Sequence, residues 1–248
     1  MNNLRYWIWF TQSIGYCTTK AKQLTFLYDS IEEFYLGGES EWRLSGLFTN
    51  HDIEKMSKTP LEISDEIISK CNKYYYDLVC IDSPEYPKCL FEIDDPPAVL
   101  YISGALPDID DRMSIAVIGT RKASMYGIKS SYNMAYNLAK SGVTVVSGGA
   151  LGVDCSSHLG ALAADGVTIC VLGCGINYDY LRENAKMRSD ITFKGAVISE
   201  YPPDTEAYSY HFPQRNRIIS ALSDGILVIE AGSRSGSLIT VNSALEQN

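Results

Sequence analysis

Five short apolar runs between residues 114 and 248 constrain the fold of this chain most strongly. Each run is rich in β-branched residues and is followed by a turn, then by a segment whose apolar residues recur at helical spacing. Runs that are apolar throughout are typical of strands buried on both faces of a sheet. Strands joined through helices pair in parallel, because the helix returns the chain to the starting end of the sheet. The pattern predicts a Rossmann-like α/β fold, a mostly parallel sheet with helices on both faces.

The boundaries of these elements follow from the apolar runs and the turn residues between them. The predicted strands are Ile115–Ile118, Thr144–Ser147, Thr168–Leu172, Ala196–Ser199 and Gly225–Glu230. The predicted helices are Tyr126–Lys140, Val153–Asp165, Tyr180–Phe193, Gln214–Leu222 and Ser237–Gln247. Two further β-like runs, Asp77–Asp82 and Ala98–Ile102, are expected to join the edge of the sheet.

A helical pattern precedes the predicted sheet. Apolar residues recur at helical spacing in Ala21–Tyr35 and Ile63–Tyr75, glycines break the segments, and Ser64 is a candidate N-cap of the last helix. We therefore expect a small helical accessory domain in residues 1–75, SAM-like or helix-hairpin-helix-like, and the Rossmann-like domain in residues 76–248. The helical part could serve as a structural or interaction appendage or as a non-specific DNA-contact module, and its acidic charge favours the appendage.

The formal net charge of −9 belongs to the first part of the chain. Residues 1–113 hold 10 Lys and Arg against 19 Asp and Glu, whereas residues 114–248 hold 11 of each. This distribution excludes a uniformly basic nucleic-acid binder but is compatible with a local basic pocket in the sheet domain. Seven scattered cysteines favour a reduced, cytoplasmic protein, and three distant histidines suggest no metal site. No apolar run reaches the ~20 residues that a membrane-spanning helix needs.

The loops that follow the five predicted strands are the first candidates for a binding site. Open α/β sheets bind ligands outside the carboxyl ends of their strands. Four of the loops contain glycine, which lets backbone N–H groups approach an anion at a helix N-terminus. The five loops are 119–122, 148–152, 173–175, 200–203 and 231–237, and only 200–203 lacks glycine. Together they predict a phosphate-rich ligand, although each glycine alone is equally explained by turn geometry. Neither G-x-G-x-x-G after the first strand nor a Walker A motif is present, which argues against dinucleotide and ATP sites.

Basic and aromatic residues in or near these loops match what single-stranded nucleic acid needs of a binding site. Arginine neutralises phosphate, and an aromatic ring stacks on an unpaired base. The candidates are Arg121, Lys122, Arg215, Arg217 and Arg234, with Phe212, Tyr208 and Tyr210 as the aromatic residues. Alternatively, Arg215 or Arg217 could form a structural ion pair with Glu200 or Glu230, because side chains at i and i+2 of a helix cannot face the same way. Phe212 could equally belong to the core.

A hydrolytic site is the second interpretation of the strand-end residues. Asp154, Glu200 and Glu230 all lie at or near predicted strand ends, so a carboxylate could perform acid–base chemistry on a nucleotide. Asp154 could instead cap the helix that it begins. The sequence leaves these two roles open and gives as alternative function a nucleotide or phosphoribosyl hydrolase on a similar fold, with Glu200 or Glu230 as the acid or base.

Six ordered motifs give a more specific indication than any single loop. They read IAVIGTRKAS, VVSGGALGVDCSSH, ICVLGCGINYDY, AVISEYPPDT, HFPQRNRIISALSDGILVIEA and SGSLIT. With the YP…DPP…LYISG stretch before them, they resemble the DNA processing protein A family (DprA, also called Smf) from about Asp82 to the end of the chain. In two places the chain departs from the family's pattern. The family often has a Lys shortly before its Phe-Pro, where this chain has Glu206–His211, and its members continue through at least another strand, so a domain truncated at its C-terminal end is expected.

This resemblance implies a single-stranded DNA-binding protein without catalytic activity. Members of the family protect incoming DNA during natural transformation, help load the RecA recombinase, and usually dimerise, so RecA and a second copy of the chain are the expected partners. The resemblance implies no catalytic residue, metal or cofactor. It places the DNA-binding residues in the GTR and FPxRNR motifs and the neighbouring glycine loops: Gly119, Thr120, Arg121, Lys122, Gly148, Gly149, Phe212, Arg215, Asn216, Arg217, Ser235, Gly236 and Ser237.

Overall fold

The computed structural model of the chain describes residues 2–232 and 235–247. The chain divides into two compact units, unit 1 (residues 1–101) and unit 2 (residues 102–248). The division falls later in the chain than the boundary expected from the sequence between residues 75 and 76. Among the described residues no helix combines the length and the apolar character needed to cross a membrane.

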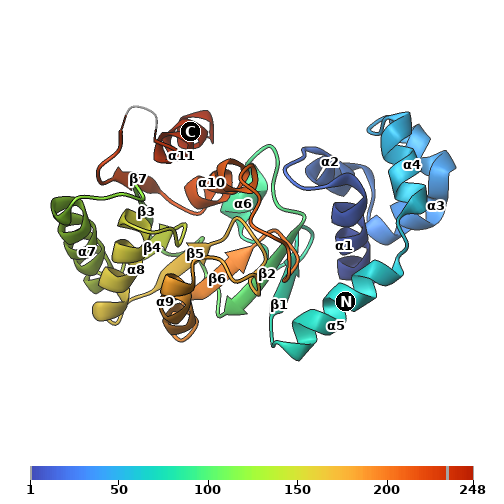
Figure 1. The fold of residues 1–248 in the computed structure, drawn as a ribbon. Helices are drawn as coiled ribbons and strands as arrows, with labels where there is room; N and C mark the ends of the chain where they lie inside the picture. Colours follow the sequence, from blue (N-terminus) through green and yellow to red (C-terminus); the bar gives the residue numbers. More distant parts are fainter. Residues whose placement is uncertain (1, 233–234, 248) are drawn as a thin grey trace. The chain divides into compact units, whose positions relative to one another are not determined.

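Unit 1 is mainly helical and is built around aromatic side chains. The YWIWF stretch of its first helix is buried, with the rings of Trp9 and Trp42 5.6 Å apart and those of Phe34 and Trp42 6.2 Å apart. Burial of such large rings supplies most of the hydrophobic stabilisation of a small helical unit. Its elements are α1 (Asn2–Ile14), α2 (Lys20–Leu27), α3 (Ile31–Leu44), α4 (Asn50–Lys58), α5 (Glu62–Lys73), β1 (Asp77–Cys80) and α6 (Lys88–Glu92) (Figure 1).

Two details of unit 1 differ from the sequence prediction. The helical stretch Ala21–Tyr35 is interrupted, because the Ser30 side chain caps α3 by accepting a hydrogen bond from the backbone N–H of Glu33. The prediction that Ser64 caps the last helix was wrong. Ser64 is buried inside α5, and Leu61, which makes no side-chain cap, precedes that helix. The apolar periodicity located the helix correctly, but a serine in its first turn was indistinguishable from an N-cap.

Unit 2 contains a sheet with the strand order β2-β6-β5-β4-β3-β7. The boundary between the two units falls within β2 (Val99–Gly104), whose residues from Ile102 onward belong to unit 2. In unit 1, β2 is hydrogen-bonded to β1. The pairs β3–β4, β3–β7, β4–β5 and β5–β6 are all parallel, with Val117 opposite Leu227 and Val146 opposite Ile169. The remaining strands are β3 (Ser114–Ile118), β4 (Thr144–Ser147), β5 (Thr168–Val171), β6 (Ala196–Ser199) and β7 (Gly225–Val228). Each of the five predicted strands of this sheet is present.

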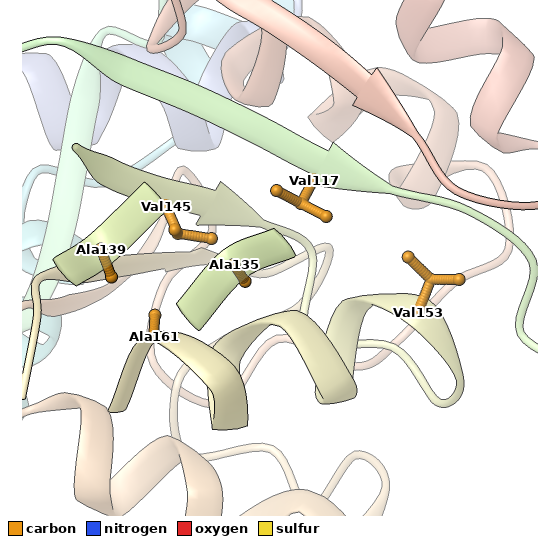
Figure 2. Packing of buried hydrophobic residues seen from close by; sticks show 6 residues of the cluster. All are labelled: Val117, Ala135, Ala139, Val145, Val153 and Ala161. Atoms are coloured by element: carbon orange, nitrogen blue, oxygen red, sulfur yellow. The ribbon is translucent and has the colours of Figure 1, made fainter. Parts of the chain in front are cut away.

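Helices cover both faces of the sheet, which confirms the predicted Rossmann-like fold class. In Figure 1, α7, α8 and α9 lie on one face, and α10 and α11 lie on the other. Figure 2 shows the first face, where Val117 and Val145 of the sheet meet small side chains of α7 and α8, among them Ala135 and Ala161. Small residues let the two helices approach closely, since a side chain at Gly160 would meet the backbone of Tyr132. The helices are α7 (Met125–Lys140), α8 (Val153–Ala163), α9 (Ala185–Ile191), α10 (His211–Ala221) and α11 (Ser237–Gln247), with a 3₁₀ turn η1 (Arg182–Asn184).

Two helix boundaries differ from the prediction for reasons of backbone geometry. The helix expected over Tyr180–Phe193 starts later, because Leu181 has a left-handed backbone (φ +51°) that no helix accommodates. Conversely, α10 begins at His211, three residues before the predicted start at Gln214. Pro213 therefore lies in the first turn, where a helix tolerates proline because no intrahelical partner is lost.

The strand order creates a switch point beside β3. From β3 the chain adds β4, β5 and β6 in succession to one side, and β7 then pairs with the other side of β3. The loops after β3 and β7 consequently lead to helices on opposite faces and leave a crevice at the carboxyl ends of the strands. This crevice is the place where a fold of this class binds its ligand.

Candidate nucleic-acid interface

A cleft of about 630 Å³ lies at the switch point, within unit 2. Its walls come from the loop after β3, the first turns of α10 and the start of α11. Asp154 contributes to it from the first turn of α8, and Tyr180 contributes from the segment after β5. The carboxyl ends of several strands thus converge on one concave surface, as the sequence predicted for a ligand site.

Phe212 lines this cleft and contacts three of its other side chains. The Cζ of Arg121 lies 5.2 Å from the centroid of the Phe212 ring, and the Cζ of Arg215 lies 6.0 Å from it. The Tyr180 ring lies 5.1 Å away. Gly173 is required beneath the phenyl group, because a Cβ there would lie 2.9 Å from Phe212 Cδ1. Phe212 is half-buried, so part of its side chain packs against the protein and part is accessible to solvent.

The loop that carries Arg121 and Lys122 is held at both ends by Glu230. The backbone N–H of Thr120 donates to the Glu230 carbonyl at 2.9 Å, while the Ser124 N–H and Oγ donate to the Glu230 carboxylate at 3.0 and 2.8 Å. The carboxylate lies close to the start of α7, where its negative charge interacts favourably with the positive end of the helix dipole. Arg121 and Lys122, between these anchors, are exposed.

Arg215 is buried and forms part of the wall of the cleft. Its Nη1 donates to the carbonyl of Gly148 at 2.9 Å and to that of Val171. Burial lowers the pKa of Arg215, and the Asp154 carboxylate opposes this effect. Burial likewise raises the pKa of Asp154, against the charge of Arg215. The two groups compensate each other, so a guanidinium can be kept at the cleft despite the cost of desolvation.

Arg217 forms an ion pair on a different side of α10. Its Nη1 and Nη2 donate to the two oxygens of Glu200 at 2.8 and 2.7 Å, and the side chains are only 7% and 2% exposed. Arg215 and Arg217 are two residues apart, so a helix points them in different directions. The sequence could not decide which of them is tied to an acid, and the structure assigns that role to Arg217.

Ten of the thirteen residues predicted for the site line the cleft. These are Gly119, Thr120, Arg121, Lys122, Phe212, Arg215, Asn216, Ser235, Gly236 and Ser237. Gly148, Gly149 and Arg217 do not line it. Gly148 lies behind Arg215, and Gly149 adopts a left-handed backbone (φ +66°). Arg234 lies outside the described residues.

Ten lining residues were not among the predicted DNA-binding residues, and two of them, Tyr180 and Asp154, carry polar groups next to the arginines. Tyr180 reaches the cleft from an irregular segment that the sequence predicted to be helical, so its position could not be inferred. Asp154 was noted as a strand-end acid or helix cap, and the backbone N–H of Ala150 approaches its Oδ2 at 3.4 Å. The sequence could not show that Asp154 lies close to Arg215, because the two residues are 61 positions apart.

The acids considered for hydrolysis have structural partners. Glu200 is paired with Arg217, and Glu230 accepts hydrogen bonds from Ser124 at the start of α7. Within the described ranges, no three His, Cys, Asp or Glu side chains are grouped so that they could hold a metal ion.

The fold and the cleft define a Rossmann-like protein with arginine and aromatic side chains at the switch point of its sheet. The family model described as DNA recombination-mediator protein A matches residues 77–248, and the chain belongs to that family. It is 40% identical over 167 residues to the DNA processing protein DprA of Bacillus subtilis, covering 67% of this chain and 56% of that protein. It is 43% identical over 171 residues to the protein Smf of Escherichia coli, covering 68% of this chain and 46% of that protein.

The chain spans about half the length of these curated relatives. Among solved structures, the X-ray structure of DprA from Streptococcus pneumoniae superposes with a TM-score of 0.84 at 31% identity, over 98% of this chain and 83% of that chain. A structure of DNA processing protein A from Helicobacter pylori, described as giving insight into a unique single-stranded DNA binding mode, has a TM-score of 0.63 at 32% identity. That likeness covers 70% of this chain and 78% of the other.

Proposed function

We propose that this chain binds single-stranded DNA in the cleft at the switch point of unit 2. The observation that carries the proposal is the exposed Arg121 guanidinium lying over the half-buried Phe212 ring. Arg121 and Lys122 supply charge for phosphate, and a half-exposed ring supplies a surface for an unpaired base. The single-stranded DNA binding mode described for the Helicobacter pylori relative supports the same ligand.

In this proposal the DNA-binding residues are those predicted from the sequence, with unequal roles. Arg121, Lys122 and Phe212 contact the strand, while Gly119, Thr120, Asn216 and Ser235–Ser237 supply polar groups along the wall. Arg215 contributes its charge from the wall, and Gly148 supports it from behind, while Gly149 supplies the left-handed turn that follows. Arg217 contributes indirectly, since its pairing with Glu200 fixes α10.

The wider role follows from the family. We infer a recombination mediator of the cytoplasm that protects incoming DNA and helps load RecA during natural transformation, acts as a homodimer, and performs no catalysis. The description of the family as DNA recombination mediators supports this role. The helices of residues 1–75 would then form an accessory domain, SAM-like or helix-hairpin-helix-like.

The test is fluorescence anisotropy of a labelled oligothymidine and of its duplex counterpart across a salt series. We expect tight, salt-sensitive binding of the single strand and weak binding of the duplex. Arg121→Ala should weaken binding and lower the slope of log K against log salt by about 0.7, the contribution of one phosphate contact on a single strand. The matched control is Lys194→Ala, which removes the same charge before β6, at the opposite edge of the sheet.

Two results would contradict the proposal. If the wild-type protein bound neither DNA, the cleft would not be a nucleic-acid site. If it released free base from nucleoside monophosphates with a turnover that Glu230→Gln abolished, the protein would be a hydrolase. An unchanged affinity and slope in Arg121→Ala would show instead that Arg121 is structural.

A further inference from the structure

Two exposed tyrosines beside the cleft form a stacked pair. The rings of Tyr208 and Tyr210 have centroids 5.7 Å apart and planes inclined by only 12°. Their side chains are 45% and 58% exposed. Two large rings in parallel contact at the surface present a flat aromatic face to solvent, which is the geometry that accepts another aromatic ring.

The tyrosine pair is supported from below by two buried rings. His211 lies edge-on to both tyrosines, with centroid distances of 5.3 Å to Tyr208 and 4.6 Å to Tyr210. His211 is itself stacked on the buried Tyr201 ring at 3.9 Å. The backbone N–H of His211 also donates to the Tyr208 carbonyl at 3.0 Å. The pair is therefore attached to the core rather than carried on a loose loop.

The pair stands at the rim of the cleft. Its residues alternate with Ala207 and Ser209, both of which line the cleft, and Phe212 follows two residues after Tyr210. A strand that contacts Phe212 could reach the pair with a neighbouring nucleotide, because successive nucleotides are only several ångströms apart along a strand.

The charge beside the pair disfavours phosphate. Glu206 lies next to the pair, since the backbone N–H of Tyr208 donates to the Glu206 carbonyl at 3.1 Å, and the charge of its carboxylate raises the pKa of Tyr208. The exposed cations of the cleft, Arg121 and Lys122, belong to a different segment of its wall. A bound strand would therefore direct its backbone toward these cations and its bases toward the tyrosines.

We propose that Tyr208 and Tyr210 form a stacking subsite for an unpaired nucleobase of the strand bound in the cleft. This inference rests on the proposed single-stranded DNA binding and adds to it a contact that depends on bases and not on phosphates. Phosphate contacts weaken as the salt concentration rises, whereas base stacking does not. A salt series therefore separates the contributions of the two kinds of contact to the affinity for DNA.

The experiment compares two DNA strands of equal length, an oligothymidine and an abasic strand that keeps every phosphate. The protein variant is Tyr208→Leu/Tyr210→Leu, and binding is measured by anisotropy across a salt series. The variant should bind oligothymidine about tenfold more weakly than the wild type, with an unchanged salt slope. Its preference for oligothymidine over the abasic strand should shrink by the same factor.

Two further variants control for folding and for loss of any surface tyrosine. Tyr208→Phe/Tyr210→Phe keeps both rings and should bind like the wild type. Tyr132→Leu removes an exposed tyrosine of α7 that does not line the cleft, and it should bind like the wild type as well. Circular dichroism melting of each variant identifies any loss of folded protein.

The outcomes distinguish this inference from the proposed function. If the wild type bound both strands equally well, or if the leucine variant kept its base preference, the stacking subsite would be refuted while DNA binding stood. A leucine variant with a reduced salt slope would show that the tyrosines contact the backbone, which also refutes the inference. A wild type that bound neither strand would overturn both proposals.

Discussion

Replacing Arg217 with methionine should destabilise the protein strongly without removing a DNA contact. Arg217→Met would leave the Glu200 carboxylate, whose side chain is 2% exposed, without its bidentate partner. An uncompensated buried charge costs about 3–5 kcal/mol, whereas exchanging a whole buried pair for apolar residues is often close to neutral. The double variant Arg217→Met/Glu200→Leu should therefore be more stable than Arg217→Met alone.

The assay is urea unfolding followed by far-ultraviolet circular dichroism. Tryptophan fluorescence would not serve, because the chain's three tryptophans, Trp7, Trp9 and Trp42, all lie in unit 1. The unfolding free energy of Arg217→Met should fall by about 3–5 kcal/mol, and the double variant should recover part of the loss. The folded fraction should bind oligothymidine with the wild-type salt slope.

One result would refute this reasoning. Arg217→Met could be as stable as the wild type, while its slope of log K against log salt for oligothymidine falls by about 0.7, the contribution of one phosphate contact. Arg217 would then contact DNA directly, as the FPxRNR resemblance implied, and its contact with Glu200 would contribute nothing to folding. A double variant less stable than either single variant would likewise exclude the compensation argument.

Two further predictions concern stability in unit 2. Burial, with a smaller contribution from the charge of Arg215, lowers the pKa of His158 to about 3. The buried neutral imidazole leaves stability unaffected above the unfolded pKa of about 6.5. As pH falls from there toward 3, the free energy of unfolding should decrease by up to about 1.4 kcal/mol per pH unit, because only the unfolded state takes up the proton. In urea unfolding, the stability of His158→Leu should therefore depend less on pH. Part of the slope should remain, because burial also lowers the pKa of His211. Gly148→Ala should cost about 1–3 kcal/mol in urea unfolding and weaken DNA binding, because its Cβ would lie 2.6 Å from Arg215 Nη2, whereas Gly232→Ala, with open space around it, should be neutral.

The sheet was predictable because its signal is local. β4, β5 and β6 are short, mostly apolar runs that are buried along their whole length, and burial on both faces of a sheet requires that pattern. The carboxyl ends of parallel strands meet at one edge, so the glycine loops could be assigned to a common site before their distances were known. The position of Arg121 at the cleft follows from the same rule, whereas that of Phe212, within the first turn of α10, does not.

The remaining features depend on contacts between residues distant in sequence. Whether Arg215 or Arg217 faces the cleft is set by the rotation of α10 against the sheet, which the sequence of the helix alone does not fix. The irregular path before α9 depends on the left-handed backbone of Leu181, a residue type that rarely adopts it. The stacking of Tyr208 on Tyr210 depends on the buried rings beneath them.

The attachment of the Arg121 loop to Glu230 bears on how long a strand stays bound. Thr120 and Ser124 both donate hydrogen bonds to Glu230, which attaches the two ends of the loop to a single residue. Only the three residues between them keep backbone freedom. A loop already ordered before its ligand arrives loses little conformational entropy on binding, and gains of this kind appear mainly as slower dissociation. Because Glu230 lies only two residues beyond the end of β7, a displacement of that strand would alter the residence time of DNA without changing a residue that contacts it.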